Sequence, residues 1–371
     1  MAPILPPLVK LMSIGLFDLP AFLHAVGTAV PHHDVHPAFL DWAQQQLTGH
    51  RDAMLFRRMA GRSGIDHRWS VLPDQGRSPT ASGGFYDALD WPGTTARMAI
   101  YAQEAPDLAC SAIEQLGEQV AIDGITHLVL ASCTGFVAPG IDQIIARRLR
   151  LAPSVERLLI GFMGCYAAVA ALRSARHIVR SDPSARVLVV TVELSTLHLQ
   201  QVTELESVLA MLQFGDGAAA ALVTAEPKGF AIRRPFATTL ADSHDLIRWA
   251  ITDEGFAMHL SGEVPNRIAT ALADEAFASA VTGGHPPCDI DGWAVHAGGR
   301  SILDAAERTL GLPAEALGAS RSVLADYGNM SSATLMFVLA RLLAGQPVTR
   351  GVALAFGPGL AAEGFAFESS T

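Results

Sequence analysis

The sequence predicts an α/β protein whose β-sheets are covered by helices on both faces. Three observations support this: short continuous apolar runs typical of buried strands, helical patterns between them, and a weak internal duplication. The chain of 371 residues has no low-complexity stretch or Ser/Gly linker. We therefore expect two halves, residues 1–226 and 227–371, that pack tightly against each other.

The strands and helices alternate along the chain. Apolar runs predict strands over residues 126–131, 186–192, 217–223, 292–295 and 352–356. Helical patterns lie between them and include residues 166–179, 301–310 and 333–343.

The duplication repeats one order of elements. In each half a strand ends in small polar residues, a helix starts at a small-residue turn, and another strand follows. The spacing agrees, because Cys165 and Glu193 are 28 residues apart, and so are Asn329 and Gly357. Two related halves would bring their strand ends and helix N-termini to one shared centre.

Composition excludes several classes of protein. Half of the residues are hydrophobic, 17% are charged and the mean hydropathy is +0.30, so the chain is not intrinsically disordered. The net charge of −10 argues against sequence-independent nucleic-acid binding, which uses a basic face. The most apolar windows are shorter than the roughly 20 residues of a membrane span, and the N-terminus lacks a secretory pattern. Four cysteines without a CxxC motif form no disulfide framework, so we expect a soluble, cytoplasmic protein.

Cys165 is the strongest candidate for a reactive residue. It lies in the segment GFMGCYAAVAAL, where Gly161 and Gly164 permit a crowded turn and an Ala-rich helix follows. The dipole and free N–H groups at a helix N-terminus favour an anion, so we expect a lowered thiol pKa. From this segment alone, a buried structural cysteine is an equal alternative.

His296 and Asn329 occupy matching places in the duplicated pattern. His296 ends the strand in GWAVHAGG, and Asn329 opens a helix in YGNMSSAT. Each residue alone is more often structural, since Asn is a common helix cap. Together with Cys165 they suggest a single site, because an imidazole stabilises a thiolate and two N–H donors stabilise an enolate or tetrahedral oxyanion.

Five segments carry a family resemblance: GFMGCYAA, WAVHAGGR, DYGNMSSAT, FGDGAAAALV and AFGPGL. In order and spacing they resemble the type III polyketide synthases, the chalcone and stilbene synthase superfamily, over about residues 20–365. The resemblance implies a thiolase fold, a five-layered αβαβα arrangement with the nucleophile in the first half and His and Asn in the second. It also implies an obligate homodimer. It is closer to bacterial members, including alkylresorcinol- and alkylpyrone-forming enzymes, than to plant ones.

The resemblance assigns roles to the residues nearest the reaction. Cys165 matches the nucleophile that holds the acyl chain. His296 and Asn329 match the pair that activates the thiol and binds the malonyl thioester carbonyl. Phe214 matches the aromatic gatekeeper, and Met258 stands where plant enzymes have a second Phe, which should make that face more adaptable.

Other matched positions predict the substrate pocket. They are Ser331 in the cavity segment, Gly357, Pro358 and Gly359 in the cyclisation loop, and Ala138, which one subunit inserts into its neighbour's cavity. Three positions depart from the plant pattern: Cys133 and His198 replace threonines, and Trp249 replaces a small residue. Cys133 is either a second reactive thiol or an uncharged lining residue, and we favour the second. Because of these changes, no chalcone or stilbene product is predicted.

The basic segment FRRMAGRSGIDHR resembles the family's coenzyme A clamp. Arg58 and Arg62 match its phosphate-binding positions, and their four-residue spacing would put both on one helical face. A third basic position is Leu55 here, so we expect a weaker clamp or one shifted toward Arg57. The alternative is a solvated basic face, but in a chain of net charge −10 we favour a phosphorylated ligand.

Three other functions are alternatives to this one. Papain-like proteases share the chain order Cys, His, Asn, but the sequence has no CGSCW-type segment. A ketoacyl-carrier-protein synthase III-like condensing enzyme is the alternative, and a non-catalytic acyl-carrier-binding scaffold is a distant one.

We predict a homodimeric type III polyketide synthase. It would load an acyl-CoA starter, extend it with malonyl-CoA, and cyclise the product to a pyrone or a phenolic or resorcinolic ring. Coenzyme A thioesters are the substrates, and no metal or redox cofactor is implied.

Overall fold

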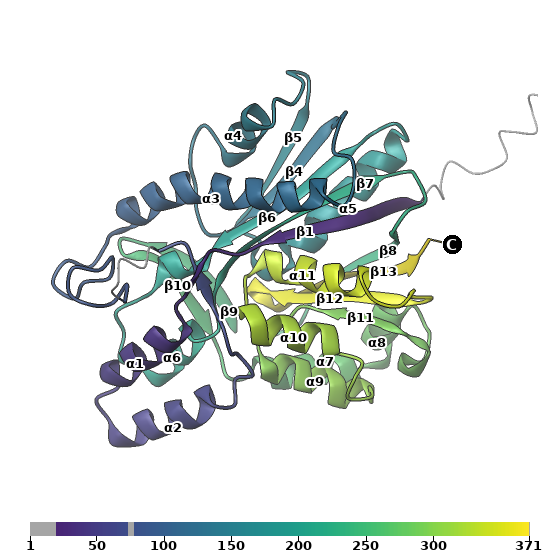
Figure 1. The fold of residues 1–371 in the computed structure, drawn as a ribbon. Helices are drawn as coiled ribbons and strands as arrows, with labels where there is room; N and C mark the ends of the chain where they lie inside the picture. The colour runs from purple at the N-terminus through teal and green to yellow at the C-terminus, as the bar shows by residue number, and fades with distance from the viewer. Residues whose placement is uncertain (1–19, 73–77, 371) are drawn as a thin grey trace, which may run out of the picture.

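The centre of the fold is a mixed sheet of nine strands in the order β11-β12-β13-β8-β1-β7-β6-β4-β5 (Figure 1). The computed structural model describes residues 20–72 and 78–370. The N-terminal segment lies outside the described residues, so the structure does not bear on the expected absence of a secretory signal there. The nine strands are β1 (Ala21–Ala29), β4 (His127–Ser132), β5 (Glu156–Gly161), β6 (Val187–Leu194), β7 (Asp216–Thr224), β8 (Phe230–Thr239), β11 (Gly292–Val295), β12 (Gly351–Gly357) and β13 (Ala361–Ser369).

Two short sheets and eleven α-helices complete the described part. β2 (His33–Asp34) pairs with β3 (Trp69–Ser70), and β9 (Ile247–Thr252) forms a hairpin with β10 (Gly255–Leu260). The helices are α1 (His36–Gln46), α2 (His50–Ala60), α3 (Thr94–Gly117), α4 (Ile141–Arg148), α5 (Ala167–Ser181), α6 (Leu205–Met211), α7 (Val264–Ala273), α8 (Glu275–Thr282), α9 (Arg300–Leu310), α10 (Gly318–Tyr327) and α11 (Ser332–Leu343).

The two halves of the chain have the same topology over four strands each, and β5 is an additional edge strand of the first half. In the first half β4 and β6 are parallel, and β7 and then β1 continue the sheet antiparallel. In the second half β11 and β12 are parallel, and β13 and then β8 continue antiparallel. The halves meet where β1 pairs with β8. The internal duplication seen in the sequence is therefore a duplication of the fold.

The fold has five layers, as the thiolase-like resemblance implied (Figure 1). α5 and α11 lie between the two halves of the sheet and share one hydrophobic core with both. α3 and α4 cover the outer face of the first half, and helices α7 to α9 cover the outer face of the second.

The alternation of side chains along a strand explains this layering. In β4, Leu128 and Leu130 pack toward α3, whereas Val129 and Ala131 face the central helices. β12 shows the same division in the second half of the fold, with Val352, Leu354 and Phe356 facing outward and Ala353 and Ala355 inward. Small inward residues leave room for α5 and α11 to pack closely.

All five strands and all three helices expected from the sequence are present, with ends that differ by one or two residues. The five strands could be recognised in the sequence because each is buried on both faces and so appears as an apolar run. None of the helices in the described residues is long and apolar enough to span a membrane. The described part also contains no cluster of His, Cys, Asp and Glu suited to binding a metal ion.

Candidate active site

Cys165 lies in a 3-10 turn, Gly164–Tyr166, directly before α5. Gly164 has a φ of 75°, a left-handed conformation that favours glycine. A Cβ on Gly164 would also lie 2.4 Å from the Cδ atom of Pro358. This turn therefore requires glycine for both its backbone conformation and its contact with the loop after β12.

Asn329 connects the surroundings of Cys165 to the second half of the fold. Its side chain lies close enough to the Cys165 thiol to favour a lower thiol pKa, and so does the side chain of Ser331. The Nδ2 atom of Asn329 donates to the Gly298 carbonyl at 3.3 Å, and its Oδ1 accepts from the Ser331 N–H at 2.8 Å. These two bonds hold the amide with its N–H side toward Gly298.

His296 follows the last residue of β11, and its backbone N–H donates to the Leu354 carbonyl at 2.8 Å. Its ring lies against Gly298, where a Cβ would be 3.4 Å from the ring Nε2 atom. Only 2% of His296 is exposed, and both ring nitrogens lack a hydrogen-bond partner among the described residues. A buried imidazole without partners can bind a ligand at no cost in existing hydrogen bonds.

The expected low pKa of Cys165 is wrong for the structure as it stands. Burial, reinforced by the nearby Glu193 carboxyl, raises the pKa of the Cys165 thiol to about 12. Burial also lowers the pKa of His296 to about 3. The sequence argument considered only the helix N-terminus, whereas desolvation dominates here and keeps both groups neutral. A neutral imidazole still has one N–H donor for a carbonyl oxygen.

Glu193 is the buried residue that the sequence analysis left without a role. It ends the apolar run of β6, and its Oε2 atom accepts from the Cys133 N–H and the Thr134 hydroxyl at 2.9 Å each. The Ser332 hydroxyl donates to its other oxygen. Burial raises the Glu193 pKa to about 7, although these hydrogen bonds oppose the shift. A lone carboxylate in a strand that is otherwise apolar except for Thr191 was the signal that could have identified it.

A small cavity of about 20 Å³ lies beside Cys165. Six of the ten predicted pocket residues line it: Cys133, Phe214, Trp249, Met258, Ser331 and Pro358. The Cys133 sulfur accepts the Gly164 N–H at 3.0 Å, and burial raises the Cys133 pKa well above its ordinary value. These observations support an uncharged, cavity-lining Cys133.

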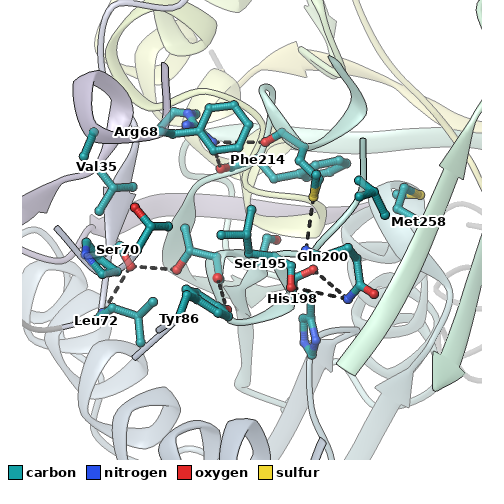
Figure 2. Close-up of a pocket in the computed structure, with 18 of the residues that line it drawn as sticks. Val35, Arg68, Ser70, Leu72, Tyr86, Ser195, His198, Gln200, Phe214 and Met258 are labelled. Carbon is teal, nitrogen blue, oxygen red and sulfur yellow. Dashed lines mark hydrogen bonds between the residues drawn. The ribbon is translucent and has the colours of Figure 1, made fainter. Parts of the chain in front are cut away.

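A larger cavity of about 180 Å³ adjoins this one (Figure 2). Both cavities share four lining residues: Ser195, Phe214, Trp249 and Met258. Apolar side chains from α1, α6 and the β9–β10 hairpin form much of the larger cavity, including Phe39, Met211 and Ala257. We call it the inner cavity.

His198 lines the inner cavity and is held on both ring nitrogens. Its Nε2 atom bonds to the Thr134 carbonyl at 2.7 Å, and its Nδ1 accepts the Phe256 N–H at 3.0 Å. Its ring stacks on Phe256 at 4.2 Å and meets Trp249 edge to face. Burial lowers its pKa to about 3, so His198 is a neutral, fixed part of the wall.

Phe214 and Met258 approach the site from different elements. The backbone of Phe214 pairs with Asn329, and the buried Arg68 donates to the Phe214 carbonyl at 2.9 Å (Figure 2). Met258 lies on β10 opposite Trp249 of β9. Phe214 is therefore held by its backbone pairing with Asn329, whereas Met258 lies on a separate hairpin.

Three predicted pocket residues line neither cavity: Gly357, Gly359 and Ala138. A Cβ on Gly357 would lie 2.6 Å from the ring of Tyr166, and the Tyr166 hydroxyl bonds to the Pro358 carbonyl at 3.3 Å. Tyr166, which had no assigned role, thus holds the loop that carries Pro358. Gly359 has a left-handed φ of 72°, and Ala138 is exposed on this protomer.

The expected basic face of one helix is wrong. α2 ends at Ala60, so Arg62 lies in the turn beyond it and does not share a helical face with Arg58. Arg62 lines a surface cavity of about 620 Å³ together with Arg300 from α9. Arg58 is exposed and does not line this cavity.

Comparison with known proteins agrees with this fold. Residues 17–227 match the profile of the chalcone and stilbene synthase N-terminal domain, and residues 232–371 match that of the C-terminal domain. The chain is 36% identical over 287 residues to "Alpha-pyrone synthesis polyketide synthase-like Pks18" of Mycobacterium tuberculosis, covering 73% of this chain and 72% of that protein.

Solved structures give the same result. PKS-I from the brown alga Ectocarpus siliculosus superimposes with a TM-score of 0.85 at 31% identity, covering 94% of this chain and 98% of that one. The C-terminal type III polyketide synthase domain of Steely1 from Dictyostelium has a TM-score of 0.86 at 25% identity, covering 95% and 100%. These matches decide against the ketoacyl-carrier-protein synthase III-like alternative. The chain belongs to the chalcone and stilbene synthase family, the type III polyketide synthases.

Proposed function

We propose that the protein transfers an acyl group from acyl-CoA to Cys165, extends it with malonyl-CoA and releases an α-pyrone. The observation that carries this proposal is the position of Asn329. Its side chain lies near the Cys165 thiol and donates to the Gly298 carbonyl, and the unpartnered His296 ring packs against the same Gly298. One nucleophile and two N–H donors are the groups that a decarboxylative condensation requires.

Loading exchanges one thioester for another. The Cys165 sulfur attacks the acyl-CoA carbonyl, coenzyme A leaves as the thiol, and the acyl group remains on Cys165. Because burial keeps the pKa of this thiol high, its proton must leave as the thioester arrives. His296 is neutral and has a free ring nitrogen to accept that proton.

Extension starts with malonyl-CoA in the same place. Its thioester oxygen accepts hydrogen bonds from His296 and Asn329, and loss of carbon dioxide leaves an enolate on that oxygen. The enolate carbon attacks the Cys165 thioester, which forms a carbon–carbon bond and releases the cysteine sulfur. The product is a β-ketoacyl-CoA that can load again.

The inner cavity supports an apolar starter group. It adjoins the Cys165 cavity, and apolar side chains form much of its wall. Burial of a methylene group there contributes about 0.8 kcal/mol. We therefore propose that the acyl chain of the starter occupies the inner cavity, with Phe214, Trp249 and Met258 at the boundary.

The similarity to Pks18, whose name describes α-pyrone synthesis, supports a lactone as the product. After two extensions, the enol oxygen of the triketide attacks its own thioester carbonyl and expels coenzyme A. This closure needs neither a metal nor a redox cofactor. Arg62 is proposed to bind a phosphate of the coenzyme A substrates at the surface cavity, and Arg58 to contribute from the exposed face of α2.

Incubation of the purified protein with malonyl-CoA and a panel of acyl-CoAs from two to about twenty carbons tests this proposal. We expect mass spectrometry to detect 6-substituted 4-hydroxy-2-pyrones, with the highest rates for starters whose chain fills the inner cavity. Cys288→Ala, at an exposed cysteine, is the matched control and should retain the wild-type product profile. Resorcinols as the main product would contradict lactonisation, and no condensation with any starter would contradict the function.

We also propose that the protein is a homodimer that pairs along β5. This edge strand of the sheet exposes Leu158 and Leu159 (42% and 46%), and Phe136 is 48% exposed in the loop between β4 and α4. Exposed apolar edge strands favour pairing with another strand. The same loop carries the exposed Ala138, in the position expected to enter the neighbour's cavity.

Substitution of this edge should separate the protomers. Leu158→Lys with Leu159→Lys places like charges along the proposed contact, so light scattering should show a shift from dimer to monomer. Met54→Lys, at another exposed apolar residue on α2, is the control and should leave the mass unchanged. A monomeric wild type, or a double variant that remains dimeric, would contradict the proposed interface.

A further inference from the structure

The surface cavity contains one arginine from each half of the fold. Arg62 comes from the turn after α2, and Arg300 is the first residue of α9. Its volume of about 620 Å³ exceeds that of the inner cavity. Apolar side chains form part of the wall between the arginines: Met59, Ile65, Leu209 and Leu212.

This cavity borders the backbone that holds Asn329. Gln213 lines it, and the Gln213 carbonyl accepts the Asn329 N–H at 2.7 Å. Gly299 also lines it and directly follows Gly298, which accepts the Asn329 side chain. Two residues that line the surface cavity therefore connect it to Asn329, a proposed oxyanion donor. Gln213 does so through a direct backbone hydrogen bond, and Gly299 through its neighbour Gly298.

The Arg300 side chain is held in place by protein contacts, and part of it remains exposed to a ligand. Its Nη1 atom donates to the Arg62 carbonyl at 3.1 Å, and its Nε lies 3.5 Å from the Asp304 carboxylate. The same carboxylate is 2.8 Å from Arg321, which also lies 2.8 Å from the Glu307 carboxylate. About half of the Arg300 side chain (51%) is exposed.

Arg57, toward which the sequence suggests that the clamp is shifted, is bound by another residue. The Arg57 guanidinium donates to Gln44 of α1 at 3.3 Å, and Arg57 does not line the surface cavity. Leu55 occupies the position where a third basic residue was expected. The proposed clamp therefore lacks its third cation on α2.

We propose that Arg300 supplies this third cation and binds a phosphate of the coenzyme A thioester together with Arg62. This inference rests on the proposed function. A guanidinium group offers several N–H donors to phosphate oxygens, and the N-terminal dipole of α9 adds to the attraction. Asp304 competes with the phosphate for Arg300 and so weakens coenzyme A binding.

Calorimetric titration with coenzyme A tests the contribution of Arg300. We expect Arg300→Ala to raise the Kd roughly three- to tenfold, because the lost contact is charge-assisted but partly exposed. Arg300→Lys should restore part of the loss. The controls Arg57→Ala, and Arg308→Ala at the exposed end of the same helix, should bind as the wild type does.

Asp304→Asn tests the competition in the opposite direction. It frees the Arg300 charge, so we expect the Kd to fall roughly two- to fivefold. In an Arg300→Ala background the same change should have little effect, since the two residues act on one contact. A purely structural role for Arg300 would not make the Asp304 variant bind more tightly.

Truncated ligands identify which phosphate is bound. If Arg300 contacts the 3′-phosphate, dephospho-coenzyme A should lose the sensitivity to Arg300→Ala; if it contacts the diphosphate, only pantetheine should lose it. Equal coenzyme A binding by the wild type and Arg300→Ala, or an equal loss with pantetheine, would overturn the inference and leave the proposed function standing. Failure of the wild type to bind coenzyme A would overturn both.

Discussion

Cys165→Ala is expected to abolish product formation while a slow decarboxylation of malonyl-CoA continues. The acyl group then has no attachment point, so no carbon–carbon bond can form. His296 and Asn329 remain, and their N–H groups can still stabilise the enolate that decarboxylation produces. Parallel measurement of carbon dioxide release and polyketide formation, with radiolabelled malonyl-CoA, separates the two reactions.

The control for this change is Cys133→Ala, because Cys133 lines the same cavity. We expect it to retain covalent loading of the starter, detected by the mass of the acylated protein, whereas Cys165→Ala should show none. Acylation of the Cys165→Ala protein at Cys133 would remove Cys165 as the sole attachment point. Retained polyketide synthesis in Cys165→Ala would refute the proposed mechanism.

Asn329→Ala is expected to lower the rate of malonyl-CoA decarboxylation by about 10²–10³-fold, the typical effect of removing one oxyanion donor. The loss should appear in kcat more than in KM, because the hydrogen bond strengthens as negative charge develops on the thioester oxygen. Steady-state kinetics of carbon dioxide release measures this effect.

Asn329→Asp distinguishes this role from a structural one. It keeps the acceptor for the Ser331 N–H, while it replaces the donor with a negatively charged oxygen. We expect a loss at least as large as that of Asn329→Ala with a smaller change in melting temperature. Asn266→Ala on the exposed side of α7 is the neutral control. Normal decarboxylation in either Asn329 variant would remove Asn329 from the site.

The segments around Cys165, His296 and Asn329 could be predicted because their sequence patterns are local. A strand buried on both faces appears as a continuous apolar run, and a glycine in a left-handed turn remains visible as GFMGCYAA. The two halves could be predicted for the same reason, since Cys165 and Asn329 lie at equivalent helix starts. The resemblance then supplied the layer order, which spacing alone did not contain.

The protonation of the site could not be predicted in this way. The pKa values of Cys165 and His296 depend on how completely distant elements exclude water, and the pKa of Cys165 also depends on the Glu193 carboxyl of β6. Desolvation is a property of the whole packed structure, and here it exceeds the effect of one helix end. For the same reason the sequence did not assign Glu193.

By itself, the sequence determined the family and the α/β order of elements, and it singled out Cys165, His296 and Asn329 as the candidate catalytic residues, because short motifs encode each of these features. Only the tertiary structure decided which side chains from distant parts of the chain lie together around the site. Arg62 and Arg300 are 238 residues apart in the chain, yet a hydrogen bond joins them at one cavity. Arg58 and Arg62 are only four residues apart, yet Arg58 lies in α2 and Arg62 lies in the turn beyond its end. Contacts between elements follow from how their buried faces pack, and that packing is a property of the complete chain.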